Sequence, residues 1–144
     1  MEKVCLIIED ELGGVRPIIY RLRKTMKVVF PLEQDLISIV SNLPHILQNT
    51  VPDVILLDLM IPSKPGGLPS DLAGIDFLRM VREGHDMLKG LIKENTPIIV
   101  LSGYEGITNL EEKYRNEVSK IFSKPVSTKV LVSAIDKVIA EGWG

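Results

Sequence analysis

Short apolar runs rich in β-branched residues alternate along the chain with longer segments in which apolar residues recur at helical spacing. Because the short runs are apolar almost throughout, we expect strands that are buried on both faces of a parallel sheet. The alternation therefore predicts an α/β fold, a doubly wound parallel sheet with helices on both faces. The five predicted strands are residues 4–8, 27–30, 54–57, 98–101 and, with the weakest signal, 120–122.

Five helices are predicted between and after these strands, and two of them have clear start signals. Pro17 fits the first turn of the first helix, where no backbone N–H is needed, and this places Gly13 and Gly14 in the preceding loop. The last helix is expected to open after Pro125 with Ser127 as its N-cap, and its apolar residues follow a near-ideal amphipathic spacing.

The second helix is the least clearly bounded. Pro44 is expected near its start, with Ser41 or Asn42 as N-cap and residues 43–49 as a short body. The upstream segment 32–40 remains ambiguous between helix and loop.

The third helix is expected from residue 75 to about 82, with an extension to residue 91 left open, and the fourth lies within 109–118. Residues 63–74 form a Gly/Pro-rich interruption, and no linker separates a second domain. We therefore expect one domain that covers residues 1–144.

Composition and charge narrow the possible functions. The formal net charge is -2 and the basic residues are scattered, so we expect no direct binding of nucleic acid. The densest basic run, residues 21–24, is interpreted as the solvated face of a helix. The single cysteine, Cys5, fits a reducing compartment, and the apolar run at residues 4–8 is too short for a signal peptide or a membrane span. The expected location is the cytoplasm, without membrane insertion.

Polar side chains stand where the predicted strands end. Glu9 and Asp10 follow the first strand, Asp58 the third, Ser102 the fourth and Lys124 the fifth. Doubly wound sheets bind ligands at the carboxyl ends of their strands, so we expect these five side chains to meet in one crevice. Three carboxylates there would repel one another, which favours a divalent cation of the Mg²⁺ type. A cation, a lysine and a hydroxyl around one carboxylate suit an incoming phosphoryl group, so Asp58 is interpreted as a nucleophile.

The segments "IIED", "VILLDLMIP", "VLSG" and "FSKP", in this order, resemble the receiver domain of two-component response regulators, the CheY-like superfamily. The resemblance covers essentially the whole chain. It implies a flavodoxin-like receiver fold with the strand order 2-1-3-4-5. It also implies that a sensor histidine kinase or a histidine phosphotransfer protein phosphorylates the chain, and that a downstream protein effector responds.

The resemblance also implies a role for each matching residue. Asp58 would accept the phosphoryl group in a self-catalysed reaction, without other enzymatic activity. Glu9, Asp10 and Asp58 would bind Mg²⁺ together with a backbone carbonyl. Ser102 would follow the phosphoryl group as the switch hydroxyl, and Lys124 would pair with its oxygens.

Other positions complete or depart from the family pattern. The carbonyl of Met60 would be the backbone ligand of Mg²⁺, and Pro125 would follow a cis peptide bond. Met60 and Tyr104 resemble positions that tune the lifetime of the aspartyl phosphate. Ile121 replaces the aromatic residue that is frequent three positions before the lysine. The segment between Pro62 and Gly74 is longer than usual, and it either shields the site, binds a partner or is a neutral insertion.

Other functions stay open beside this hypothesis. Asp58 could simply form a turn, and a receiver-like binding module could act without phosphorylation. A phosphatase of the haloacid-dehalogenase type would need an acid where Met60 stands, and a flavodoxin-like carrier would need a phosphate-binding loop after the first strand. His45 and His85 are isolated and are expected at the surface or in helices. Cys5 is expected in the core, and Trp143 in packing or an ordered tail.

Overall fold

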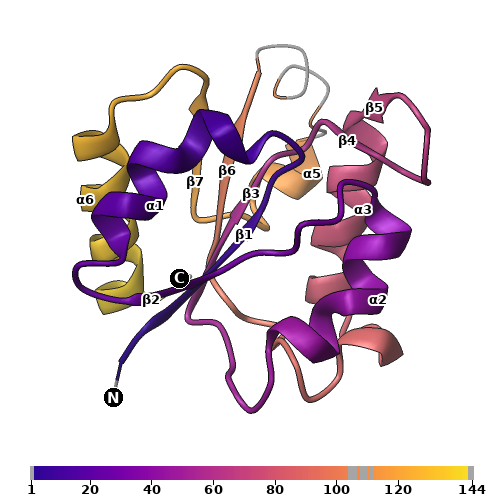
Figure 1. Cartoon of the computed structure of the whole chain (residues 1–144), viewed down its shortest axis with the longest axis horizontal. Coiled ribbons are helices and arrows are strands. Elements are labelled where there is room, and N and C mark those ends of the chain that lie inside the picture. The colour runs from indigo at the N-terminus through magenta and orange to yellow at the C-terminus, as the bar shows by residue number, and fades with distance from the viewer. Residues whose placement is uncertain (1, 104–106, 108–109, 111, 143–144) are drawn as a thin grey trace.

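The computed structural model describes residues 2–103, 107, 110 and 112–142. Its main sheet has five parallel strands in the order β2-β1-β3-β6-β7, and Figure 1 shows them at the centre of the molecule. The predicted fold class and strand order are thereby confirmed. The strands are β1 (Val4–Ile8), β2 (Lys27–Val29), β3 (Val54–Leu57), β6 (Ile98–Ser102) and β7 (Lys120–Ser123).

Helices cover both faces of the sheet, as predicted (Figure 1). Helices α1 (Arg16–Leu22) and α6 (Thr128–Glu141) lie on one face. Helices α2 (Leu36–Ile46), α3 (Asp71–Arg82) and α5 (Glu112–Arg115) lie on the other. The sheet therefore forms the middle layer of three.

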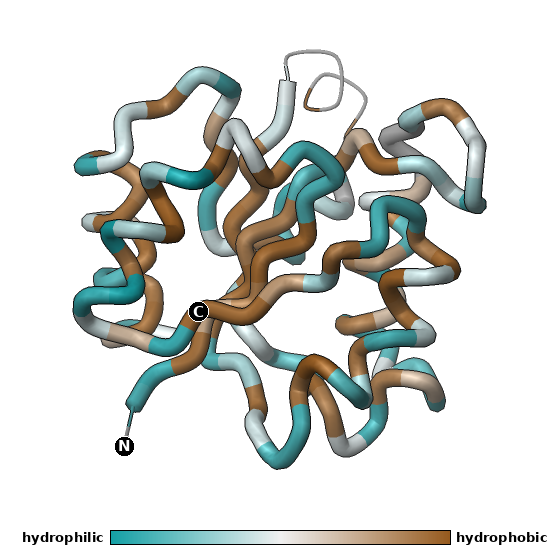
Figure 2. Tube along the Cα trace, in the orientation of Figure 1, coloured by the Kyte–Doolittle hydropathy of each residue, from teal (hydrophilic) through white to brown (hydrophobic). Residues whose placement is uncertain are grey.

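Each buried strand supplies both cores, because successive side chains point to opposite faces. In β1, Cys5 and Ile7 pack with residues of α1 and α6, whereas Leu6 and Ile8 pack with residues of α2 and α3. Figure 2 shows the resulting concentration of hydrophobic residues along the central strands. Burial on both faces explains why the strands are apolar throughout instead of alternating with polar residues.

The prediction for the second helix was wrong. Helix α2 begins at Leu36, and the side chain of Asp35 caps it by accepting a hydrogen bond from the Ser38 backbone N–H at 2.9 Å. Ser41 and Asn42 therefore lie inside the helix. Pro44 lies in its last turns rather than near its start.

The third helix begins at Asp71, earlier than the expected residue 75, and ends at Arg82. It does not extend to residue 91, because Gly84 has a φ of +65° and a separate 3-10 helix, η2 (Asp86–Leu88), follows. A second 3-10 helix, η1 (Leu12–Val15), contains Gly13 and Gly14, which were expected in a loop. Short helices of this kind carry too few residues for a periodic signal.

The Gly/Pro-rich interruption at 63–74 is partly ordered into a small hairpin. Strand β4 (Ile61–Pro62) pairs antiparallel with β5 (Pro69–Ser70). The hairpin returns the chain to α3, where Gly74 lies against the Leu59 backbone so closely that a Cβ would stand 2.3 Å from the Leu59 Cα. Gly74 is therefore required by the close approach of helix α3 to the segment after β3.

At the other end of the chain, the Ser127 side chain caps α6 by accepting a hydrogen bond from the Val130 N–H at 3.1 Å, which confirms the predicted cap. Tyr104 and Trp143 lie outside the described residues. Among the described residues, no helix has the length and apolarity needed to cross a membrane.

Candidate functional site

Polar side chains converge at the carboxyl edge of the sheet. Glu9 and Asp10 follow β1, Asp58 follows β3, Ser102 ends β6 and Lys124 follows β7. Parallel neighbours bring these positions side by side: Ile8 pairs with Leu57, so the residues after them are adjacent. We call these five residues the carboxylate cluster.

Asp58 is at the centre of the carboxylate cluster and is fixed by three donors. Its Oδ1 accepts hydrogen bonds from the Ser102 hydroxyl at 2.8 Å and from the Met60 backbone N–H at 3.0 Å. Its Oδ2 accepts a hydrogen bond from the Lys124 ammonium at 3.1 Å. The residue is only 5% exposed, so its carboxylate has few orientations open to it.

Lys124 bridges two carboxylates. Its Nζ donates to Glu9 Oε1 at 2.8 Å as well as to Asp58 Oδ2. Burial lowers the pKa of Lys124, but the hydrogen bonds and charges of Glu9 and Asp58 outweigh it and raise that pKa above its ordinary value. The ammonium is therefore held as a cation between the two acids.

The carboxylates remain crowded in spite of this lysine. One carboxylate oxygen each of Glu9, Asp10 and Asp58 lies within 4.8 Å of the others. Burial and the charge of Asp58 raise the pKa of Glu9 to about 8. Burial and Asp58 also raise the pKa of Asp10. Both shifts mean that burial, together with the nearby charge of Asp58, disfavours the ionised forms of Glu9 and Asp10.

These residues fit a hard divalent cation. The donor set consists of carboxylate oxygens from the segments that follow two neighbouring strands, β1 and β3, and oxygen ligands are what Mg²⁺ prefers. The raised pKa values of Glu9 and Asp10 show that an additional positive charge would be stabilised there. Soft ligands are absent from this group, so the set does not favour zinc or copper.

Comparisons with known proteins agree with this architecture. The signal receiver domain of a putative Luxo repressor protein from Vibrio parahaemolyticus superposes with a TM-score of 0.70 at 13% identity, over 98% of this chain and 92% of that one. A Francisella response regulator receiver domain gives a TM-score of 0.66 at 20% identity, over 98% of both chains. A CheY-like receiver domain protein from Methanospirillum hungatei gives 0.63 at 16% identity, over 98% and 96%.

The chain has the receiver-domain fold of response regulators. In sequence, the cell cycle transcriptional regulator CtrA of Caulobacter vibrioides is 30% identical over 92 residues, which are 64% of this chain. The match spans 33% of CtrA, so this chain corresponds to about a third of that relative's length. No protein-family model matches the chain.

Within this receiver fold, the five side chains predicted from strand ends do meet, while their roles remain predictions. Met60 contributes its N–H to Asp58, and the role of its carbonyl as a metal ligand stays a prediction. The peptide bond between Lys124 and Pro125 is cis, as the resemblance implied. Ile121 is half-buried and packs against the core on the α2–α3 face.

Residues expected outside the site are indeed elsewhere. His85 caps η2, where its Nδ1 accepts a hydrogen bond from the Met87 N–H at 3.2 Å, and His45 is exposed in the last turn of α2. Cys5 is fully buried in the core, and burial raises the pKa of its thiol to about 12. The Cys5 thiol is therefore neutral and unreactive.

Sequence reasoning missed one contact that supports the carboxylate cluster. The Gln34 side-chain amide donates a hydrogen bond to the Asp10 carbonyl at 3.0 Å and ties the segment after β2 to the acidic segment after β1. Gln34 lies in the region that the sequence left ambiguous, and no local pattern marks a glutamine that reaches a carbonyl 24 positions away.

Proposed function

We propose that residues 1–144 form a phosphoacceptor receiver domain of a two-component phosphorelay, with Asp58 as the acceptor. A sensor histidine kinase or a histidine phosphotransfer protein supplies the phosphoryl group in the cytoplasm. The phosphorylated domain then changes its contacts with a downstream protein effector. Apart from forming and losing its own aspartyl phosphate, the domain catalyses no reaction.

The arrangement of donors around Asp58 carries this proposal. A strand-end aspartate needed only for a turn would not require a buried hydroxyl at 2.8 Å and an ammonium at 3.1 Å on its two oxygens. These two donors hold the carboxylate in one orientation, which a nucleophile requires. They also surround the space beside Asp58 with groups that can hold phosphoryl oxygens.

The chemistry is a displacement at phosphorus. A carboxylate oxygen of Asp58 attacks the phosphorus of a phosphohistidine, and an O–P bond forms while the N–P bond breaks. The electron pair of the broken bond stays on the imidazole nitrogen, which takes up a proton. Lys124, which is hydrogen-bonded to Asp58, then donates its hydrogen bonds to the phosphoryl oxygens. The Ser102 hydroxyl can donate to a second phosphoryl oxygen.

Glu9 and Asp10, with Asp58, are the residues that would hold Mg²⁺. When bound, the ion supplies positive charge that offsets the phosphoryl oxygens and the crowded carboxylates. Glu9 is also bonded to Lys124, so the acid and the lysine hold each other in position beside Asp58. The carbonyl of Met60, two residues after Asp58, is proposed as a further oxygen ligand.

Phosphorylation from a small donor tests the proposal. Incubation with Mg²⁺ and acetyl phosphate should add one phosphoryl mass to the wild type, and hydroxylamine should remove it, as it does from an acyl phosphate. Asp58→Asn should gain no mass, because the attacking carboxylate is gone while the side-chain shape is kept. Asp76→Asn, at an exposed position on α3, is the matched control and should be labelled like the wild type.

Failure of the wild type to gain mass from acetyl phosphate and from phosphohistidine proteins would reject the proposal. The chain would then be a receiver-like binding module that acts without phosphorylation. Labelling of Asp58→Asn to the wild-type extent would instead move the acceptor to another residue.

A further inference from the structure

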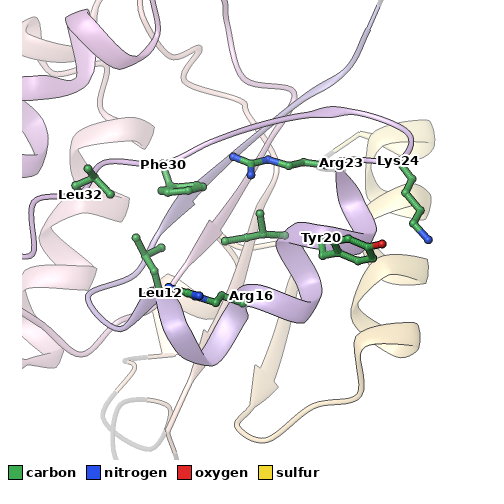
Figure 3. Close-up of a pocket in the computed structure, with 8 residues that line it drawn as sticks. Leu12, Arg16, Tyr20, Arg23, Lys24, Phe30 and Leu32 are labelled. Atoms are coloured by element: carbon green, nitrogen blue, oxygen red, sulfur yellow. The ribbon is translucent and has the colours of Figure 1, made fainter.

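A groove of about 680 Å³ runs along α1, on the side of the helix that faces the segment after β2 (Figure 3). It shares no residue with the carboxylate cluster, so it is a separate surface. We call it the α1 groove. Its apolar and aromatic lining residues are Leu12, Ile19, Tyr20, Phe30 and Leu32, and its basic lining residues are Arg16, Arg23 and Lys24.

The apolar part of the α1 groove combines a buried floor with an exposed rim. Ile19 belongs to the core between α1, α6 and the sheet, and Phe30 packs against that core. Tyr20 and Leu32 are 72% and 76% exposed, and Figure 3 shows them at opposite ends of the groove. Exposed aromatic and aliphatic side chains beside a concave apolar floor are typical of protein interfaces.

All charges that line the α1 groove are positive. In the described part of the chain, no ion pair involves Arg16, Arg23 or Lys24. Two of these cations lie instead over aromatic rings: the Arg23 Cζ is 5.5 Å from the centre of the Phe30 ring, and the Lys24 Nζ is 5.1 Å from that of Tyr20. The rings hold the cations at the rim without neutralising them.

This positive charge is local. Positions 12–32 hold five basic residues and no acidic one, whereas the other positions hold 12 basic and 19 acidic residues. The segment that supplies all the lining residues of the α1 groove is thus basic within an otherwise acidic chain. Complementary charge selects a negatively charged partner and repels a basic one.

We propose that the α1 groove binds an acidic amphipathic helix of a protein partner. The apolar face of that helix covers Ile19, Tyr20 and Leu32, and its carboxylates pair with the unneutralised cations of the rim. A helix fits better than an extended strand because the groove follows α1 lengthwise, and antiparallel or crossed helices bury such grooves well.

Other anionic partners match these observations less well. Nucleic-acid bases stack on free aromatic faces, but Phe30 and Tyr20 are already faced by Arg23 and Lys24. A membrane surface is broad and negatively charged, and the acidic remainder of the chain would be repelled by it. A single acidic helix, in contrast, can contact the basic segment at positions 12–32 without approaching the acidic remainder of the chain.

The test uses a stapled helical peptide with Glu on its polar face and Leu on its apolar face, titrated into the full chain labelled with ¹⁵N. We expect amide shifts that centre on positions 12–32 and an affinity that falls as salt is added. Combining Arg16→Glu with Arg23→Glu should weaken binding by about tenfold or more. Lys120→Glu makes the same kind of charge change on β7, at the opposite edge of the sheet, and should leave the affinity within about twofold of the wild type.

Tyr20→Ala provides a second variant that leaves Arg16 and Arg23 in place. Because Tyr20 is an exposed rim residue, its truncation should leave the fold intact and lower the affinity for the acidic peptide several-fold. The same peptide with Lys in place of Glu should not bind.

Several results would overturn the proposal. One is the absence of any amide shift at about 1 mM acidic peptide. Another is that the Lys-faced peptide binds as tightly as the Glu-faced peptide. A third is that the Arg16→Glu, Arg23→Glu variant binds the acidic peptide as tightly as the wild type. Phosphatidylserine vesicles or duplex DNA that bind more tightly than the peptide, and lose binding in that variant, would assign the groove to another partner class. Self-association that disappears in the variant would assign it to a second copy of the chain.

Discussion

The carboxylate cluster and the α1 groove use charge in opposite ways. In the cluster, charged groups of both signs are joined by hydrogen bonds, as when the partly exposed Lys124 bridges the buried Glu9 and Asp58. In the groove, charges of one sign are exposed beside apolar side chains, and none is paired among the described residues. Paired charges fix a geometry and suit a reaction, whereas exposed, unpaired charges suit recognition of a partner.

This difference predicts how strongly each region responds to substitution. A change in the carboxylate cluster removes a ligand or a donor that is held in place by hydrogen bonds to its neighbours. A change in the α1 groove alters a screened, solvated charge. Effects on metal binding, stability and phosphorylation should therefore be large in the first region and small in the second.

The largest expected effect concerns metal binding. Asp10→Asn removes one charged oxygen ligand from the carboxylate cluster and should weaken Mg²⁺ binding by about a hundredfold, measured by calorimetry. Glu11→Gln is the matched control, since it neutralises the next residue, which is exposed, and should change the affinity little. Equal Mg²⁺ affinity of Asp10→Asn and the wild type would remove Asp10 from the site.

A pH effect on stability should come next. Burial and the charge of Asp58 raise the pKa of Glu9 to about 8, so between about pH 4.5 and pH 8 the folded chain holds a proton that the unfolded chain has lost. The free energy of unfolding without Mg²⁺ should therefore fall as pH rises through this window, by up to about 5 kcal/mol. Asp10, whose pKa is raised for similar reasons, should contribute in the same direction.

Denaturant unfolding across this pH range measures the effect. Glu9→Gln should flatten the dependence, because glutamine cannot titrate, and saturating Mg²⁺ should oppose the loss at high pH by binding the ionised carboxylates. A stability that does not fall with pH in the metal-free wild type would show that folding does not raise the pKa of Glu9.

A smaller effect is expected from the buried hydroxyl. Ser102→Ala removes the donor 2.8 Å from Asp58 Oδ1 and should slow phosphorylation by acetyl phosphate by about tenfold, while leaving Mg²⁺ affinity nearly unchanged. Ser102→Thr retains a hydroxyl and should restore most of the rate. Equal rates for the alanine and threonine variants would mean that the hydroxyl has no part in the transfer.

The smallest effect tests the separation of the two regions. The combined Arg16→Glu and Arg23→Glu variant should be phosphorylated by acetyl phosphate at a rate within about twofold of the wild type. Both side chains are exposed and do not contact the carboxylate cluster, so solvent and salt screen their charges. Initial rates from intact mass provide the comparison. A loss comparable to that of Ser102→Ala would show that the groove and the carboxylate cluster are coupled.

The sheet and the carboxylate cluster could be predicted because they depend on simple rules. Buried parallel strands are apolar throughout, and their carboxyl ends meet at one edge, so Asp58, Ser102 and Lys124 could be placed together from strand ends alone. What the sequence could not supply is which donor contacts which oxygen. That pairing depends on side-chain positions, as in the Lys124 bridge to Glu9.

Errors arose where a local signal had two meanings. Pro44 was interpreted as a helix start, although in α2 it lies in the last turns, and the start signal is Asp35 capping Ser38. The hairpin of β4 and β5 pairs only two residues on each strand, which is too short for any periodic pattern.

The α1 groove was predictable only in part. The lack of acids between Glu11 and Glu33 is visible in the sequence, but the basic run at residues 21–24 was interpreted as an ordinary solvated helix face. Its apolar wall could not be predicted, because Phe30 and Leu32 reach α1 only through the path of the chain after β2 (Figure 3).

The position of the phosphoryl group is the most direct test of the central claim that Asp58 is the acceptor. Borohydride reduction of the phosphorylated chain converts an aspartyl phosphate to homoserine, and peptide mass spectrometry then locates the changed residue. We expect homoserine at position 58 and at no other aspartate, with none formed when acetyl phosphate is omitted. Homoserine at Asp10, Asp53 or another acid, with Asp58 unchanged, would contradict the account.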